Sequence, residues 1–153
     1  MSDTEPEPMT LRELSDRAEI AELLARYARA VDDGDWELLD TVFTTDAEID
    51  LSDPGGPRGT RAEVRAWLAK TLPMWPGRQH LLGIASITLA GDTATAQATF
   101  TDTLSPSRDL IDDAAPGFTR GGGVYHHRLV RAPEGWRSNA MTIEQQWRTM
   151  HSG

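Results

Sequence analysis

Asp32 and His80 are the two residues whose types and settings best suit proton chemistry. Asp32 directly follows Val31, the last residue of an apolar helical stripe, so it stands at a helix C-terminus. The helix dipole disfavours a carboxylate there by about 0.3–1 kcal/mol. His80 opens an apolar segment, and histidine titrates near neutral pH, which suits a general base oriented by a carboxylate. Structural roles also fit: Asp32 as a solvated turn residue, which its spacing favours, and His80 as a hydrogen-bonded core residue.

Tyr27 and Asp102 are further candidates for the same site. Tyr27 lies on the apolar helical stripe and could either pack in the core or donate its hydroxyl to a substrate oxygen. Asp102 continues the otherwise apolar face of a segment, residues 93–103, that alternates with period two. An ionised carboxylate on a buried face must be paired or hydrogen-bonded. The alternative is that the strand has already ended and Asp102 lies in water.

The remaining polar motifs predict neither a metal site nor a cofactor site. His126 and His127 are adjacent, so in a strand they face opposite sides and cannot bind one metal ion together. The chain has no cysteine, and no zinc-ligand spacing, catalytic serine motif, phosphate-binding loop or dinucleotide fingerprint occurs. We therefore expect no metal and no cofactor. The run Gly121–Gly123 is interpreted as a strand entry or a bulge.

Apolar residues at helical spacing predict a long first helix that ends near Asp32. Its stripe consists of Ile20, Leu23, Leu24, Tyr27 and Val31. Two starts are possible: a capping box that begins at Thr10, or a later cap at Ser15 or Asp16. The position of Asp32 relative to the core depends on this helix.

Two further helices and a short strand are expected before the main sheet. Asp35 is a typical N-cap for a short second helix, and residues 60–63 form a capping box that opens a third. Residues 47–51 are a candidate strand. The segment 53–59, rich in Pro and Gly, is a turn region.

Strand patterns dominate the second half of the chain. We expect strands over 79–89, 93–103, 121–131 and 136–147, with a long loop over 104–120. Helices first and consecutive strands later indicate an α+β domain with helices packed on one face of an antiparallel sheet.

Composition narrows the function classes. The chain has 153 residues, 39% hydrophobic and 25% charged, and a formal net charge of −9. This balance indicates one globular domain and argues against nucleic-acid binding. No apolar run approaches the ~20 residues of a membrane-spanning helix. Residues 1–9 are acidic and lack the pattern of a secretory signal, so we expect a disordered lead, a single domain over 10–153 and a cytoplasmic location.

Four motifs give the chain a family resemblance over residues 14–149. They are IAELLARYARAVDDGDWELLDTVF from Ile20, RQHLLG around His80, GGGVYHHRLVR from Gly121 and the EGW turn with Trp136. On these motifs the sequence resembles SnoaL-like members of the nuclear-transport-factor-like superfamily. The resemblance implies a cone-shaped barrel, in which a curved antiparallel sheet wraps around a pocket and is closed by the N-terminal helices.

The resemblance also implies roles for the candidate residues. Scytalone dehydratase, the bile-acid dehydratases and hexachlorocyclohexane dehydrochlorinase use an Asp/His dyad whose His follows the Asp by about 48 residues. Here 80 − 32 = 48, so the roles transfer to Asp32 and His80. The bile-acid dehydratases add a Tyr five residues before the Asp, which matches Tyr27, and an acidic residue on a later strand, which lies near Asp102.

The function implied by the resemblance is a cofactor-independent lyase of the dehydratase type, acting on a small hydrophobic cyclic molecule such as a polyketide or steroid. An isomerase or a polyketide cyclase could use the same base. Small subunits of ring-hydroxylating dioxygenases share the fold without catalysing a reaction, so a non-catalytic binding or accessory protein is the other alternative. Relatives commonly form homodimers, and we expect a homodimer here.

Overall fold

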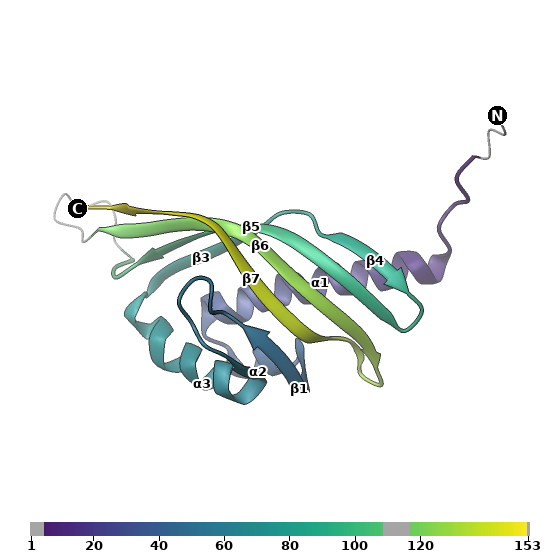
Figure 1. The fold of residues 1–153 in the computed structure, drawn as a ribbon, viewed down its shortest axis with the longest axis horizontal. Helices are drawn as coiled ribbons and strands as arrows, with labels where there is room; N and C mark the ends of the chain where they lie inside the picture. Colours follow the sequence, from purple (N-terminus) through teal and green to yellow (C-terminus); the bar gives the residue numbers. More distant parts are fainter. Residues whose placement is uncertain (1–4, 109–116, 153) are drawn as a thin grey trace.

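The structure is a computed structural model that describes residues 5–108 and 117–152, with helices on one side of a long curved sheet (Figure 1). The helical elements are α1 (Leu11–Asp33), α2 (Trp36–Asp40), α3 (Arg61–Thr71) and the 3₁₀ turn η1 (Leu72–Met74). The strands are β1 (Phe43–Asp50), β2 (Arg58–Thr60), β3 (Gly77–Leu82), β4 (Ser86–Ala90), β5 (Thr93–Ser105), β6 (Phe118–Ala132) and β7 (Gly135–His151). The order of elements confirms the α+β class.

Capping fixes both ends of α1. The Thr10 side chain accepts a hydrogen bond from the Glu13 amide, and the Glu13 carboxylate accepts one from the Thr10 amide. The helix therefore starts with the first of the two predicted caps. Gly34 ends it in the left-handed conformation, with φ at 67°, which glycine adopts without steric cost. Asp35 caps α2 and Thr60 caps α3, as predicted.

The sheet is mixed, so the prediction of a wholly antiparallel sheet is wrong at one pair. The strand order is β2-β1-β7-β6-β5-β3, with β4 also paired to β5, and β1 runs parallel to β7. Hairpins fix the direction of consecutive strands only. β1 and β7 are separated in the chain by five other strands, and their relative direction is set by how the helices fold back.

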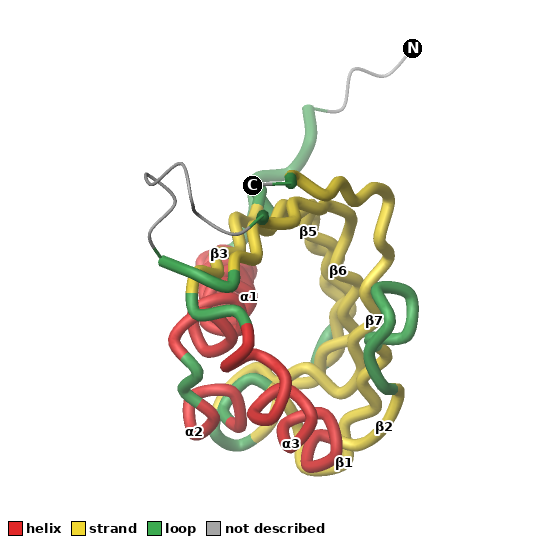
Figure 2. Tube along the Cα trace, turned by 90° about the vertical axis from the view of Figure 1, so that its left-hand side faces the viewer, coloured by secondary structure: helices red, strands yellow, loops and turns green. Residues whose placement is uncertain are grey.

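The predicted cone-shaped arrangement is confirmed: the sheet is curved and the helices cover its open side, while the described strands do not close into a barrel. Closure requires hydrogen bonds between the two edges of a sheet. Within the described residues the edges are β2 and β3, and these strands do not pair with each other. The helices lie on the concave side between the two edges (Figure 2). They take the place of the strands that would complete a barrel.

Strand boundaries differ from the prediction at three places. The predicted strand 79–89 is divided into β3 and β4. Strand pairing is interrupted near Gly83, and the segments on both sides of it pair with β5. β5 continues to Ser105 and β6 begins at Phe118, so the predicted loop 104–120 is shorter, and residues 109–116 lie outside the described part of the chain. Of the predicted lead, residues 1–4 also lie outside it, and residues 5–9 form neither helix nor strand.

One apolar core lies between α1 and the concave face of the sheet. The predicted helical stripe is buried throughout, and so is the alternating face of β5. The largest fully buried apolar side chains include Trp136, Tyr125, Ile20, Leu23, Leu39, Ile49, Leu129 and Met141. No helix among residues 5–108 and 117–152 is long and apolar enough to span a membrane.

A partly buried ion pair joins the start of α1 to the β6–β7 hairpin. The Asp16 carboxylate accepts from Arg131 Nη1 at 2.7 Å and Nη2 at 2.9 Å, and from Trp136 Nε1 at 3.0 Å. The Arg131 guanidinium lies 4.6 Å from the centre of the Trp136 ring. Hydrogen bonds from Arg131, then Trp136, lower the pKa of Asp16 to about 2. This network fixes the N-terminal helix against the C-terminal half of the sheet.

Replacing Asp16 with asparagine is expected to lower the free energy of unfolding by about 3 kcal/mol at pH 7, because it removes the buried one of the two carboxylates that pair with Arg131. Urea denaturation measures this. Asp92 provides the control, since its exposed carboxylate accepts from Arg131 Nε at 2.8 Å. Asp92→Asn should cost less than about 1 kcal/mol. Equal losses for the two variants would contradict the interpretation.

Candidate active site

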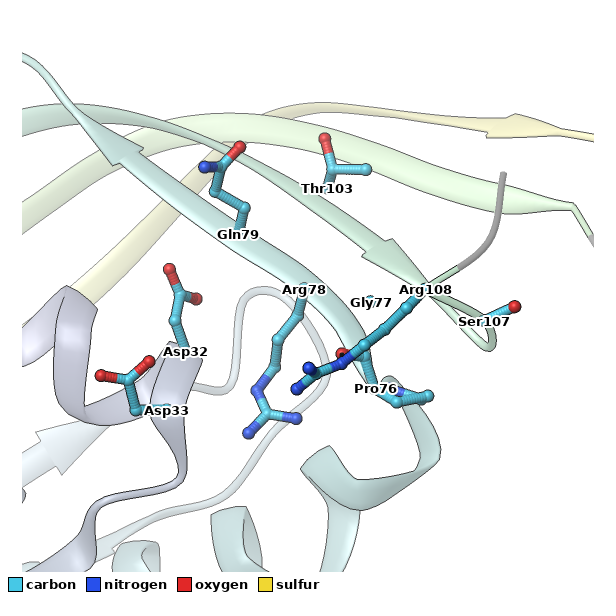
Figure 3. Close-up of a pocket in the computed structure, with 9 residues that line it drawn as sticks. All are labelled: Asp32, Asp33, Pro76, Gly77, Arg78, Gln79, Thr103, Ser107 and Arg108. Carbon is cyan, nitrogen blue, oxygen red and sulfur yellow. Dashed lines mark hydrogen bonds between the residues drawn. The ribbon is translucent and has the colours of Figure 1, made fainter. Parts of the chain in front are cut away.

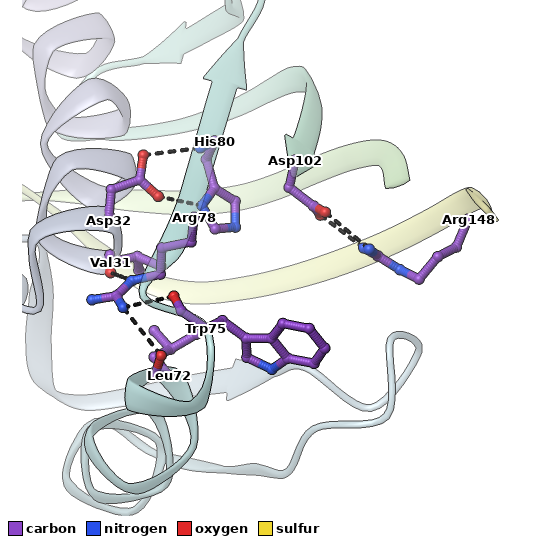
Figure 4. Close-up of polar contacts among 8 residues, drawn as sticks. All are labelled: Val31, Asp32, Leu72, Trp75, Arg78, His80, Asp102 and Arg148. Atoms are coloured by element: carbon purple, nitrogen blue, oxygen red, sulfur yellow. Dashed lines mark hydrogen bonds and ion pairs between the residues drawn. The ribbon is translucent and has the colours of Figure 1, made fainter. Parts of the chain in front are cut away.

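Asp32 and His80 are in direct contact. Asp32 Oδ1 lies 2.6 Å from His80 Nδ1, and Asp32 Oδ2 accepts a hydrogen bond of 2.9 Å from the His80 backbone amide (Figure 4). The Asp32 and His80 side chains are 20% and 11% exposed. Both oxygens of one carboxylate therefore hold one histidine, and the pair is largely shielded from bulk water.

The edge position of β3 explains why Asp32 turns toward the sheet. β3 pairs only with β5, so the His80 amide on its open side needs another acceptor. Asp32, at the end of α1, is that acceptor. Arg78, two residues earlier on β3, donates from Nε to the Val31 carbonyl at 2.9 Å, which places a positive charge at the negative end of α1. The structural interpretation of Asp32 as a solvated turn residue is therefore wrong.

The contact with Asp32 also sets the tautomer of a neutral His80 ring. An ionised carboxylate only accepts hydrogen bonds, so the proton lies on Nδ1, between the ring and Asp32. Nε2 then carries the free lone pair. Figure 4 shows this second ring nitrogen pointing away from Asp32. A lone pair in that position can accept a proton from a bound molecule.

His80 lines a cavity of about 380 Å³ enclosed by α1, α3, the β1–β2 loop and the inner face of the sheet. Most of its wall is apolar or aromatic, with Tyr27, Trp67, Trp75 and Phe100 as the aromatic residues. The polar residues are His80, Asp102, Arg148, Thr71 and Thr119. The structure thus brings all four predicted residues together, since Tyr27, His80 and Asp102 line the cavity and Asp32 lies directly behind His80.

Tyr27 presents a free hydroxyl to this cavity. Its ring is 4% exposed and makes edge contacts with Phe43 and Tyr125. No described residue hydrogen-bonds the Tyr27 hydroxyl, although buried tyrosines usually find a partner. Burial, and secondarily the Asp32 charge, raises the pKa of Tyr27. The hydroxyl therefore stays protonated and can serve as a donor.

Asp102 is buried and paired, which decides between its two interpretations. Its oxygens accept from Arg148 Nη1 at 2.9 Å and Nη2 at 2.8 Å (Figure 4). Asp102 lies opposite His80 in the β3–β5 register, so both side chains face the cavity. Sequence reasoning did not find Arg148, because its partner lies 46 residues away in the chain.

The glycine run in β6 is the signal that could have pointed to Arg148. Arg148 lies on β7 and Asp102 on β5, so the guanidinium must cross β6 at Gly121, which pairs with both residues. A Cβ atom on Gly121 would overlap the guanidinium group of Arg148. The next glycines accommodate Trp147 on the other face and a register shift in β6–β7. The run is therefore a bulge, as predicted, and also a crossing point for side chains.

Comparison with known proteins identifies the family. The family model described as SnoaL-like domain matches residues 12–142. The chain belongs to the SnoaL-like domain family. The uncharacterized protein Rv2910c of Mycobacterium tuberculosis is 34% identical to this SnoaL-like chain over 129 residues, which make up 84% of each protein. The predicted resemblance is confirmed.

Solved structures similar to this SnoaL-like domain share its architecture. An NTF2-like protein with a cystatin-like fold from Novosphingobium aromaticivorans is 30% identical, with a TM-score of 0.72, covering 89% of this chain and 85% of that one. Hexachlorocyclohexane dehydrochlorinase LinA, type 2, has a TM-score of 0.78 at 18% identity, covering 94% and 93% of the two chains. At that identity the likeness to LinA shows the fold alone.

The SnoaL-like domain has a second hollow of about 530 Å³, which Asp32 lines (Figure 3). It is lined largely by polar and charged residues, among them Asp33, Arg78 and Arg108. The Arg78 side chain has a structural role, because its Nη1 also donates hydrogen bonds to the backbone carbonyls of Leu72 and Trp75, both at 3.1 Å. This hollow therefore lacks the apolar wall and the free histidine nitrogen of the first cavity.

The adjacent histidines face opposite sides of the sheet, as predicted. His126 is partly exposed and lies 2.7 Å from Glu144, whereas His127 is buried and its Nδ1 lies 3.0 Å from the Ser138 hydroxyl. Burial lowers the pKa of His127 to about 3, and its Nε2 has no hydrogen-bond partner in the described part of the chain. Among the described residues, no three His, Cys, Asp or Glu side chains group closely enough to hold a metal ion.

Proposed function

We propose that this protein is a cofactor-independent lyase of the dehydratase type, acting on a small hydrophobic cyclic molecule. The observation that carries the proposal is the Asp32–His80 pair, joined at 2.6 Å, with the second histidine nitrogen free beside a cavity of about 380 Å³. A base oriented by a carboxylate in a mostly apolar cavity suits proton abstraction from carbon.

The proposed reaction begins when His80 Nε2 takes a proton from a carbon next to an electron-withdrawing group. Asp32 stabilises the imidazolium that forms, and Tyr27 donates a hydrogen bond to the departing oxygen. The C–O bond then breaks, a C=C bond forms, and hydroxide leaves with the proton returned by His80. The products are an alkene and water, and the dyad regains its starting protonation. Asp102 assists by holding Arg148 beside the reacting centre.

The test combines a compound panel with the His80→Ala variant. Crystals soaked with small aromatic and polyketide-like compounds should show a ligand in contact with His80. Mass spectrometry of cyclic β-hydroxy ketones incubated with the protein should show loss of one water with wild type only. A rearranged product of unchanged mass would indicate an isomerase or cyclase with the same base. Binding without any product would overturn the enzyme proposal in favour of a non-catalytic binding protein.

We also propose that two copies associate through the outer face of the sheet. The row Leu81, Thr101, Gly122 and Trp147 runs across β3, β5, β6 and β7. Side chains alternate along a strand, so this row faces away from the cavity residues His80, Asp102 and Arg148. Leu81 is 69% and Trp147 45% exposed, which supports burial of this row by a second copy.

Light scattering coupled to size exclusion is expected to give the mass of a dimer for wild type and of a monomer for Trp147→Glu, since a charge on the outer row would have to be desolvated in the interface. Leu14 is also exposed but lies on α1, so Leu14→Glu should leave the dimer intact. A wild-type monomer, or a dimer that tolerates the charge at Trp147, would overturn the interface.

A further inference from the structure

The Asp102–Arg148 pair bears on which molecules the cavity can accept. It joins the inner faces of β5 and β7 through two parallel hydrogen bonds, and Asp102 is only 5% exposed. Arg148 also donates from Nη1 to Thr119 at 3.2 Å and from Nε to the Gln145 side chain at 2.6 Å. Four of its five N–H groups are therefore already used.

The charges around the cavity leave no positive group free. Of the described residues that line it, the ones with acidic or basic side chains are Asp102, Arg148 and His80, apart from the phenol of Tyr27. Asp102 cancels Arg148, and Asp32 adds a negative charge directly behind His80. A carboxylate or phosphate that entered would lose its hydration without meeting an unpaired cation.

Arg148 cannot easily turn away from Asp102 to meet an anion. The guanidinium lies close against Gly121 of β6, in space that any side chain there would occupy. Turning it would leave the Asp102 carboxylate buried and unpaired. Breaking a buried ion pair in this way costs more free energy than breaking an exposed ion pair at the surface. The pair therefore behaves as a fixed neutral unit of the cavity wall.

We infer that Asp102 is a specificity residue that, by neutralising Arg148, makes the cavity accept uncharged ligands and reject anions. The inference rests on the proposed function, because it concerns the same cavity. The ligand class it names is an uncharged ring compound with a carbonyl or hydroxyl oxygen, which can accept from the free Tyr27 hydroxyl. Asp102 acts here through Arg148, so it positions and neutralises a charge and takes no part in proton transfer.

The test uses two probes of the same shape and different charge, 2-naphthamide and 2-naphthoate. Isothermal titration calorimetry at pH 7 should give wild type roughly tenfold or more tighter binding of the neutral amide, since the carboxylate of naphthoate loses its hydration and meets no unpaired cation. Equal or tighter binding of naphthoate by wild type would overturn the inference. Failure of both probes to bind would do so too.

Asp102→Asn should remove the preference for the neutral amide. The amide removes one negative charge and leaves Arg148 cationic, so naphthoate should bind at least about tenfold more tightly than to wild type. Adding Arg148→Met should abolish that gain. Asp92→Asn makes the same chemical change at the far ion pair with Arg131 and should leave both affinities unchanged. A folded Asp102→Asn variant that still rejects naphthoate would overturn the role of Asp102.

The two proposals can fail separately. The wild-type comparison of probes needs no variant to fold and no turnover. His80→Ala removes the proposed base without touching Asp102 or Arg148, so it should keep the discrimination against naphthoate. Charge selectivity without any elimination activity would leave this inference standing and remove the proposed reaction.

Discussion

Replacing His80 with alanine is expected to lower kcat for the proposed elimination by about 10²–10⁴-fold, the usual contribution of a general base. The variant removes the nitrogen that faces the cavity and leaves the apolar wall in place, so KM should change much less than kcat. Steady-state kinetics on the compound identified by the panel measures both. His126→Ala removes an exposed histidine from the outer face and should leave kcat unchanged.

Asp32→Asn tests how the base is oriented. An asparagine amide can donate to Nδ1, which favours the tautomer with the proton on Nε2 and leaves no lone pair toward the cavity. Long-range ¹H–¹⁵N spectra at a pH where the ring is neutral should show His80 protonated on Nδ1 in wild type and shifted toward Nε2 in the variant. Full turnover with the altered tautomer would refute the dyad, whatever the His80→Ala result.

The fold is expected to lose stability in mild acid because of His127. Its pKa is lowered to about 3 by burial, from an ordinary value of 6.5. Between these two values the unfolded chain binds a proton that the folded chain does not. The free energy of unfolding should therefore be unaffected by this group above pH 6.5 and fall as pH decreases, by at most about 1.4 kcal/mol per pH unit.

His127→Phe should remove most of this slope, because a phenyl ring keeps the contacts with Phe43 and Tyr27 and takes up no proton. Urea titrations between pH 4.5 and 6.5 make the comparison. The pKa of Asp16 is lowered to about 2, so its contribution to the free energy of unfolding changes only at a lower pH than this range. His151→Phe replaces an exposed histidine that stacks on Phe118 and should keep the wild-type slope. Parallel slopes for wild type and His127→Phe would contradict the prediction.

Local rules predicted the elements that local interactions determine. The caps at Thr10, Asp35 and Thr60 form because each side chain reaches an amide within its own first turn. The alternation along β5 predicted its buried face for the same reason. The Asp32–His80 contact did not follow from periodicity, which favoured a solvated Asp32. The family resemblance supplied it, and the open edge of β3 explains it.

Features that depend on partners distant in the chain were missed or wrong. Nothing near Arg148 indicates that it pairs with Asp102, and the glycines that admit it were interpreted only as a strand entry or a bulge. The parallel pairing of β1 with β7 and the open edges of the sheet depend on how the helices fold back across it. Both features depend on tertiary structure. The residue pattern of one strand does not indicate its direction relative to a non-consecutive strand, or whether the sheet closes.

The parallel pairing of β1 with β7 has a consequence for how the chain folds as it is synthesised. The strand that flanks β1, β7, is synthesised after β2 to β6, and the Asp16–Arg131 contact spans 115 residues. Contacts of such long separation form late and slowly. Because α1 packs on β7 as well as on α2, β3 and β4, part of its apolar stripe stays uncovered until the β6–β7 hairpin emerges. A chain cut short before β7 would present that part to chaperones or aggregate.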